Sequence, residues 1–203
     1  MSENNVQTYI DSLNAALDAR ASYERSKNSE NSSIQDTLES MRKSMTHADI
    51  ASTLQAANVD ASFINRSERS NNRYNVYAAQ KVDNAARAAR SVAELNHYSL
   101  AILKVAVALE KSETKLTHKD AVAACSLSVK HSEAKREAVI KSLRYAKHVA
   151  ANTASTQASS SINALQTLNI LSESRDAANA TQYSVNRESP IVQALAARYE
   201  IAL

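Results

Sequence analysis

The sequence predicts an all-α fold, a multi-helix bundle around a central apolar helix at about 97–114, preceded by an N-terminal helical arm. Three observations lead to this prediction. The 203-residue chain contains no glycine and one proline, whereas tight hairpin turns usually need glycine at positive φ. Apolar residues recur at spacings of three and four along most of the chain, which is the helical pattern. The most apolar stretch, 99–109, is apolar nearly all round, as expected of a buried central helix.

The first 45 residues are expected to form two helices, arranged as an arm or hairpin. A helix over about 5–25 is predicted by the apolar residues Val6, Ile10, Leu13 and Leu17. After a polar break at 26–33, a second stripe consists of Ile34, Leu38, Met41 and Met45. An apolar helix face can dock in a groove of another protein, so this stripe is the candidate contact for a protein partner or a second copy of the chain. We assign 1–45 to the arm and 46–203 to the bundle.

The middle of the chain predicts a short helix from Thr46, a restart at Asp60, and longer helices over 74–94 and 97–114. The stretch 47–64 has a weak likeness to a helix-turn-helix. It lacks the usual glycine in the turn, and its arginines follow the second helix instead of lying on it. Two packed short helices are the favoured interpretation.

The C-terminal part predicts a long helix over about 117–150, then a low-complexity segment, 152–161, that is either a weak helix or a loop. Leucines and isoleucine spaced by three mark a further helix from Ile162 to about 180. Proline is favoured at the first position of a helix, so Ser189-Pro190 is expected to open the last one.

The tetrapeptide Thr-His-x-Asp occurs twice, at Thr46 and at Thr117. Threonine followed three residues later by an acidic side chain is typical of a capping box at a helix start. The alternative is an enzyme that uses the pairs His47/Asp49 and His118/Asp120. Short motifs have high false-positive rates, so we interpret both copies as helix starts.

Few other residues suggest catalysis or metal binding. Glu94-x-x-His97 occurs once, whereas di-iron bundles need two copies of that motif and further carboxylates. Cys125 is the single cysteine and lies on an apolar helix face, so we expect an inert buried thiol. A chain without glycine cannot form the usual phosphate-cradling loops. We therefore expect a non-enzymatic protein with no cofactor and no bound metal.

Positive charge is concentrated in two blocks. Residues 65–90 and 130–147 each carry six basic and two acidic side chains, whereas 1–64 carry five basic and nine acidic ones. Guanidinium groups suit phosphates, and tyrosines can stack on unpaired bases. The candidate nucleic-acid contacts are Arg66, Arg69, Arg73, Tyr74, Tyr77, Lys81, Arg87, Arg90, Lys141, Arg144 and Lys147.

These patterns lead to a ranked functional hypothesis. The first is a binding protein for RNA or DNA, the second a structural or protein-interaction module using the N-terminal stripe, and the third the His/Asp enzyme. The polar N-terminus lacks the apolar core of a signal peptide. No apolar run is long enough to span a bilayer. We therefore expect a cytoplasmic protein that does not engage a membrane.

Overall fold

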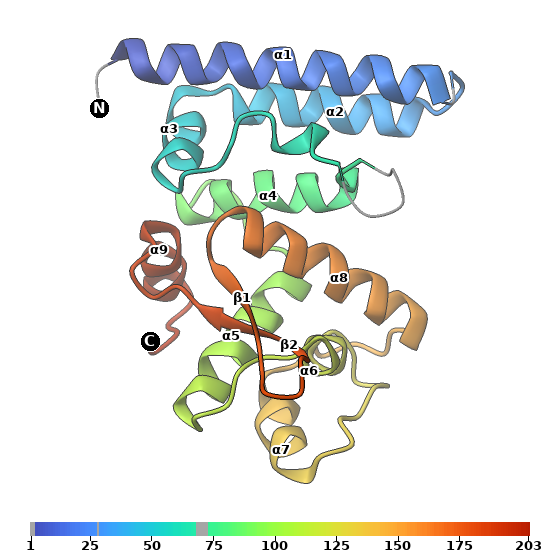
Figure 1. Ribbon diagram of the computed structural model, residues 1–203, viewed down its shortest axis with the longest axis vertical. Coiled ribbons are helices and arrows are strands. Elements are labelled where there is room, and N and C mark those ends of the chain that lie inside the picture. The colour runs from blue at the N-terminus through green and yellow to red at the C-terminus, as the bar shows by residue number, and fades with distance from the viewer. Residues whose placement is uncertain (1–2, 28, 68–72) are drawn as a thin grey trace.

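The computed structural model describes residues 3–27, 29–67 and 73–203, and within them the chain is mostly helical (Figure 1). Apart from a small hairpin, the all-α prediction is confirmed. The elements, in chain order, are α1 (Glu3–Lys27), α2 (Ser32–Met45), α3 (Ala48–Ala56), the 3₁₀ turn η1 (Phe63–Asn65), α4 (Val76–Ala89), α5 (His97–Lys111), α6 (His118–Ala124), α7 (Ala134–Leu143), α8 (Ala151–Thr167), β1 (Leu171–Arg175), β2 (Thr181–Val185) and α9 (Pro190–Arg198).

The elements are stacked along the long axis of the molecule. The antiparallel pair α1 and α2 lies at one end, α4 follows with α3 at its side, then α8 and α5, and α7 lies at the other end (Figure 1). α4 packs on α2 and α3 on one side and on α8 and α9 on the other. One buried apolar cluster extends from Leu13 in α1 to Leu195 in α9. The division into 1–45 and 46–203 stays a prediction.

The helix predicted at the centre is α5, and its central position is confirmed. Its side chains from Ala101 to Val107 are buried with one exception, Lys104. It packs against α6, α7, α8 and β2. The helix ends at Lys111, slightly before the expected residue 114.

Without glycine, the chain turns by placing other residues in the left-handed region. Positive φ values between 52° and 62° occur at Asn58, Ser91, Glu113, Asn169, Asn179 and Glu200. Several of these residues directly follow the ends of helices, where glycine is normally preferred. Asparagine tolerates this region best among residues with a side chain, and three of the six are asparagine. Polar residues thus take the place of glycine at these positions.

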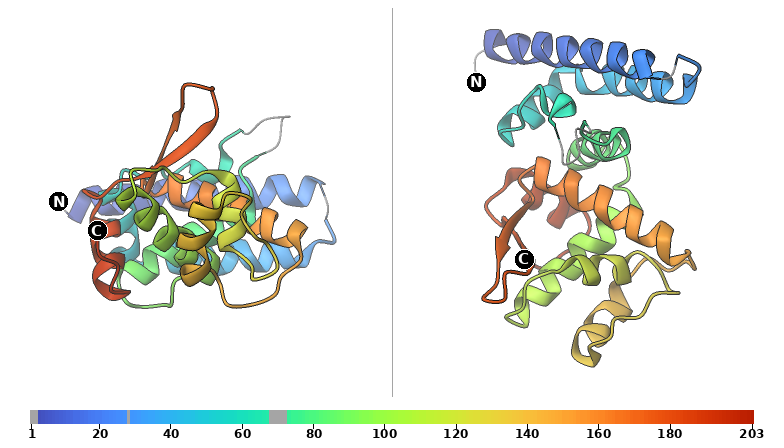
Figure 2. Two further views of the ribbon diagram at one scale, coloured as in Figure 1. Left: turned by 90° about the horizontal axis from the view of Figure 1, so that it is seen from below. Right: turned by 45° about the vertical axis from the view of Figure 1, so that its right-hand side comes forward.

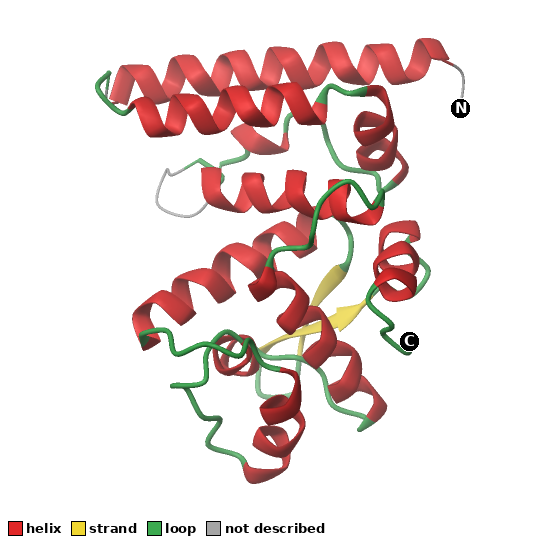
Figure 3. Cartoon of the chain, turned by 180° about the vertical axis from the view of Figure 1, so that it is seen from behind, coloured by secondary structure: helices red, strands yellow, loops and turns green. Residues whose placement is uncertain are grey.

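The predicted helix from Ile162 to 180 is wrong beyond Thr167. α8 ends there, and β1 and β2 form an antiparallel hairpin in which Leu171 pairs with Val185 (Figure 3). The turn needs no glycine, because the Asp176 carboxylate accepts hydrogen bonds from the backbone N–H groups of Ala178 and Ala180. Two backbone hydrogen bonds join Leu116 to Tyr183, so a third short segment extends the sheet.

The predicted long helix over 117–150 is also wrong, because it is two helices, α6 and α7, followed by an extended segment. Ser126 stabilises the break. Its hydroxyl donates to the Val149 carbonyl and accepts from the N–H groups of Ser128 and Val149. The chain is thereby folded back, so that the segment before α8 lies beside the end of α6.

The two Thr-His-x-Asp copies have different structural roles. Thr117 is the N-cap of α6, and it forms the complete capping box with Asp120 that the sequence predicts. Thr46 is not a helix cap of this kind. It ends α2, where its hydroxyl donates to the Arg42 carbonyl, and His47 precedes α3 without a side-chain cap.

The stretch 47–64 contains α3 and then only the single turn η1, so no second α-helix is present there. The short second helix that the sequence suggests is therefore reduced to one 3₁₀ turn. Over the described ranges, no helix combines the length and apolarity that crossing a membrane requires.

Candidate functional site

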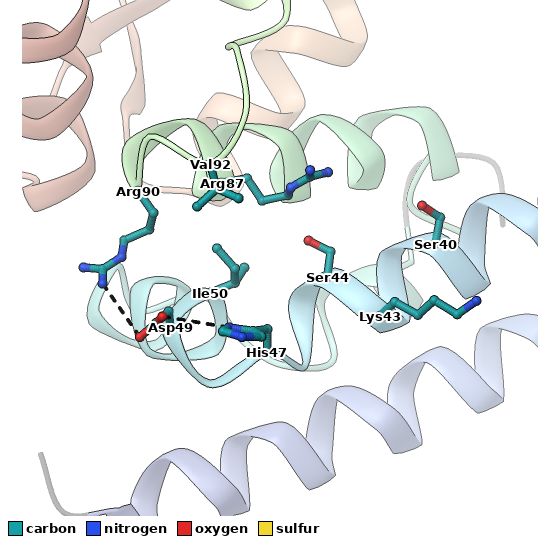
Figure 4. A pocket seen from close by; sticks show the side chains of 9 residues that line it. All are labelled: Ser40, Lys43, Ser44, His47, Asp49, Ile50, Arg87, Arg90 and Val92. Atoms are coloured by element: carbon teal, nitrogen blue, oxygen red, sulfur yellow. Dashed lines mark ion pairs between the residues drawn. The ribbon is translucent and has the colours of Figure 1, made fainter.

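A basic cleft lies between α2, the start of α3 and the end of α4. Its cavity volume is about 450 Å³, within the range of small-molecule sites. The lining residues are Ser40, Lys43 and Ser44 of α2, His47, Asp49 and Ile50 at α3, and Arg87, Arg90 and Val92 from the α4 side (Figure 4). Arg87 and Arg90 are predicted nucleic-acid contacts, and His47 and Asp49 are one of the candidate catalytic pairs. Lys43 lines the same cleft and was not selected by the sequence analysis.

The two arginines of the cleft are loosely held. Arg87 lies 3.8 Å from Asp83, and Arg90 lies 3.7 Å from Asp49, which also lies 4.0 Å from His47. Over the described part of the chain, these ion pairs are the contacts of the two guanidinium groups, and neither group donates a hydrogen bond within 3.5 Å. Charge-assisted hydrogen bonds to guanidinium groups are short and strong, so these donors remain available for an anion.

A second, more polar cavity of about 410 Å³ adjoins the cleft and shares Ser40 and Arg87 with it. Asp83 lines this cavity and is 6% exposed, and its Oδ1 has no hydrogen-bond partner. Burial raises the pKa of the Asp83 carboxyl, while a hydrogen bond between this carboxyl and the Ser44 side chain, and the neighbouring Arg87, act in the opposite direction. The exposed ring of Tyr77 and the ring of Tyr98 lie in the same lining.

Lys81 is a buried link between α4 and α8, not a surface cation. Its ammonium donates to the carbonyl and side chain of Gln157 and to the hydroxyls of Ser160 and Ser161, at 2.7–3.1 Å. Burial lowers its pKa to about 8, a shift opposed by Cys125. The prediction that Lys81 contacts a phosphate at the surface is wrong, because its donors are already engaged inside the protein.

The other residues of the first basic block are dispersed. Tyr74 is 0% exposed, and its hydroxyl bonds Thr167, so its predicted stacking on a base is wrong. Arg66 lies over the Tyr74 ring, and Arg73 lies over the Tyr23 ring while donating to Asn65. Tyr77 is 58% exposed and remains available. Arg69 lies outside the described residues.

The second basic block lies at α7, two layers away from the cleft (Figure 1). Lys141 and Lys147 are exposed there, and the Lys147 ammonium lies 6.0 Å from the centre of the Tyr145 ring. Arg144 is 9% exposed, because it pairs with Glu137 and donates to the Val129 carbonyl. Its predicted phosphate contact is therefore wrong. Among their described residues, the two blocks do not form one surface.

The apolar stripe of α2 packs inside the chain. Leu38, Met41 and Met45 are between 1% and 3% exposed and belong to the main buried cluster, on which the partly buried Ile34 packs. α2 lies between α1 and α4. The stripe is therefore not an open docking face, and the prediction that it meets a partner is wrong in this structure.

The candidate catalytic pairs are far apart and differently engaged. His47 and Asp49 are exposed at α3, whereas Asp120 is fully buried under α6 and accepts from Thr117 and Arg136. His118 contacts Ser159 of α8 instead of Asp120. Among the residues that the structure describes, no group of three or more His, Cys, Asp or Glu side chains is placed to hold a metal.

Cys125 is buried in the apolar cluster, and burial raises the pKa of its thiol to about 12. Such a thiol is not a nucleophile near neutral pH. This agrees with the interpretation of the cysteine as a packing residue.

A further surface was not identified from the sequence: the solvent-facing side of α8. No Asp, Glu, Lys or Arg occurs between 148 and 172. Apart from Ala151, the residues of α8 that face solvent fully or in part are small or amide-bearing polar residues, namely Asn152, Thr153, Ser155, Thr156, Gln157, Ser159, Asn163, Gln166 and Thr167. Basic groups border this side, since His118 contacts Ser159, and Lys115 reaches Ser174 in the hairpin.

Comparisons with protein-family models, with curated proteins and with solved structures find no match for this chain. Its function must therefore be inferred from its own geometry.

Proposed function

We propose that this protein binds nucleic acid and that α8, more than the two basic blocks, is the element that meets the bases of duplex DNA. The observation that carries the proposal is the exposed side of α8, a helix face that is polar, uncharged and bordered by basic groups. The two His/Asp pairs are not brought together into one site, and the α2 stripe is buried within the chain, so the side-chain arrangement adds no support to either alternative.

The packing around α8 supports this role. α5, α6 and α8 pack pairwise against one another, and the β1–β2 hairpin follows α8 directly. Along the chain, the order is a helix (α5), a short strand at Leu116, two further helices (α6 and α8) and a hairpin. This is the order of a helix-turn-helix unit with a β-hairpin wing, here with α7 inserted between its last two helices. In such units the last helix of the bundle enters the major groove.

The residue types on α8 suit base recognition. Asparagine and glutamine can bond adenine in the major groove, and serine and threonine can bond several bases. α8 carries no carboxylate along its 17 residues, so nothing on the helix itself repels the DNA backbone. Glu173 is the carboxylate that contacts the end of α8, through Gln166.

The hairpin and the start of α6 supply positive charge for phosphates. The hairpin projects from the body of the molecule, as seen from below in Figure 2, and it carries the exposed Arg175. Lys115 and Lys119 are exposed beside the start of α6, and Lys147 is exposed just before α8. Phosphate contacts of this kind position a protein on DNA, while base contacts give specificity.

The test is binding of the full chain to duplex DNA, single-stranded DNA and RNA across a salt series. We expect duplex DNA to bind most tightly, with a steep loss of affinity at rising salt because several phosphates are neutralised. Repeated selection from random duplexes should enrich a common sequence. Tighter binding of single strands would contradict the insertion of α8, and no binding at low salt would contradict the function itself.

The position of the proposed DNA-binding site is tested by adding negative charge to α8. The double variant Thr156→Glu/Ser159→Glu places two carboxylates on the exposed side of α8 and should weaken duplex binding by at least about thirtyfold, since facing charges of like sign cost several kcal/mol. Thr8→Glu/Ser12→Glu adds the same charge on exposed positions of α1 and is the matched control. Equal losses for both variants would place the contact elsewhere.

A further inference from the structure

The cleft between α2 and α4 lies on the face of α4 opposite to α8, and the proposed DNA contact does not use it. We propose that this cleft and the cavity beside it form one binding site for a nucleoside monophosphate. The phosphate contacts Arg87, where the cleft and the cavity meet, and the base lies beside Tyr77 and Asp83.

The charge of the cleft matches that of a phosphate monoester. Over the cleft and the cavity, Lys43, Lys81, Arg87 and Arg90 contribute four positive charges, and Asp49 and Asp83 contribute two negative charges. The balance is about +2, and a phosphate monoester carries about −1.5 to −2 near neutral pH. The Arg87 guanidinium also provides a fork of donors that phosphate oxygens accept, while Arg90 points the other way, toward Asp49 (Figure 4).

The state of those donors distinguishes the cleft from ordinary surface charge. Arg20, Arg136 and Arg198 donate short hydrogen bonds to carboxylates or backbone carbonyls. Arg87 and Arg90 have only ion pairs at 3.8 and 3.7 Å. Their loose pairing leaves hydrogen-bonding capacity that a phosphate can use without breaking an internal contact.

The adjoining cavity provides the features that a nucleobase needs. Tyr77 lines this cavity and is 58% exposed, so its ring is accessible for stacking on a planar group. Asp83 Oδ1 is buried and has no hydrogen-bond partner. A buried acceptor without a donor is costly, and an N–H group of a base would satisfy it.

The two cavities are continuous in their lining. Both are bordered by Ser40 on α2 and by Arg87 on α4. Arg87 therefore lies at the boundary, where it can contact a phosphate on one side while remaining near Asp83. Val92 and Ile50 give the phosphate end a small apolar wall (Figure 4), so the ligand has one charged end and one planar, hydrogen-bonding end.

The test is calorimetric titration of the full chain at low salt with the four ribonucleoside monophosphates, ribose 5-phosphate and inorganic phosphate, without DNA. We expect at least one nucleotide to bind about tenfold or more tightly than ribose 5-phosphate, which lacks the base. Arg87→Met should weaken nucleotide binding about tenfold, as expected for a charge-assisted hydrogen bond. Arg90→Met should weaken it less, because the Arg90 guanidinium points away from Arg87 (Figure 4). Arg25→Met, an exposed arginine of α1, should leave it unchanged.

The Tyr77→Ala variant tests the base end of the ligand separately from the phosphate end. The side chain is exposed, so the variant should fold normally, and it should weaken nucleotide binding while leaving ribose 5-phosphate unaffected. Equal affinity for ribose 5-phosphate and the nucleotides would overturn the base site. No binding of any nucleotide at millimolar concentration, or binding unaltered in both arginine variants, would overturn the whole proposal. Because DNA is absent, the result is independent of the proposed role of α8.

Discussion

The two basic blocks have the same charge in the sequence and different roles in the structure. Residues 65–90 and 130–147 each carry six basic and two acidic side chains. In the second block, Arg136 and Arg144 are bound to Asp120 and Glu137. In the first block, Arg87 and Arg90 face a cleft and make only long ion pairs. Net charge thus predicts neither which arginine stabilises the fold nor which can bind a ligand.

The difference between the arginines of the two blocks follows from how deeply the acidic partner of each arginine is buried. Asp120 of α6 is fully buried. Its carboxylate accepts from the backbone N–H and the hydroxyl of Thr117 and from Arg136, and the His131 Nε2 lies 3.4 Å from its other oxygen. Asp49, which faces Arg90, is 65% exposed in its side chain. A buried carboxylate requires compensation, whereas an exposed one is hydrated and binds its partner weakly.

The largest effect is expected from removing the partner of Asp120. Arg136→Met should lower the free energy of unfolding by about 3 kcal/mol, because breaking a buried pair leaves an uncompensated charge. Urea denaturation measures it. Asp120→Asn in the same chain should recover part of the loss, since the charge is then absent.

Arg175→Met on the exposed hairpin is the matched control, expected to change stability by less than about 0.5 kcal/mol. A loss below about 1 kcal/mol in Arg136→Met would show that Thr117 and His131 suffice for Asp120. The comparison between the blocks would then lose its physical basis.

Much of the fold was predictable because helices leave a periodic signal. The stripes of α1, α2 and α5 fixed their extents to within a few residues, and Ser189-Pro190 marked α9. The hairpin was missed because its turn uses Asp176 and Asn179 in place of glycine. The alternation of its strands is short, with Tyr183 and Val185 as the buried residues of β2.

The candidate site was less predictable, because it depends on contacts between distant segments. Arg87 and Arg90 were selected by charge, but Lys43 and His47 belong to an acidic part of the sequence, and only the packing of α2 on α4 brings them in. Lys81 was selected for its charge and proved buried, because Gln157 and two serines lie 76–80 residues away in the chain. The absence of charged residues from α8 was the one sequence signal available for its exposed surface, and this segment was interpreted as low in complexity.

Lys81 lies in the first basic block of the sequence but is buried in the fold. The effect of its titration on stability therefore gives a second test of the comparison between the blocks. Its pKa falls from 10.5 to about 8 in the folded protein. Between those values the unfolded chain holds a proton that the folded chain has released, so stability should rise with pH. Below about pH 8 the group is charged in both states, and its effect is constant.

The measurement compares the chain with its Lys81→Met variant by urea denaturation from about pH 7.5 to about pH 10. The difference should increase in favour of Lys81 by on the order of 2 kcal/mol. Cys125 has the opposite sign in this range, because its folded pKa is raised from 9.0 to about 12. Both proteins are therefore studied in a Cys125→Ala background. A difference that does not change with pH would mean that the buried amine keeps its proton.

The smallest effect should come from the cleft, and it completes the comparison. Arg87→Met and Arg90→Met remove only ion pairs of 3.8 and 3.7 Å from partly exposed guanidinium groups, so each should alter the free energy of unfolding by less than about 0.5 kcal/mol. Thermal and urea denaturation check this. A loss similar to that of Arg136→Met would mean that the cleft arginines maintain the packing of α2 on α4. Unchanged stability together with weakened nucleotide binding would instead show that the two blocks have different roles. Arginine donors that make no hydrogen bond within the fold can be removed without a loss of stability, although a ligand needs them.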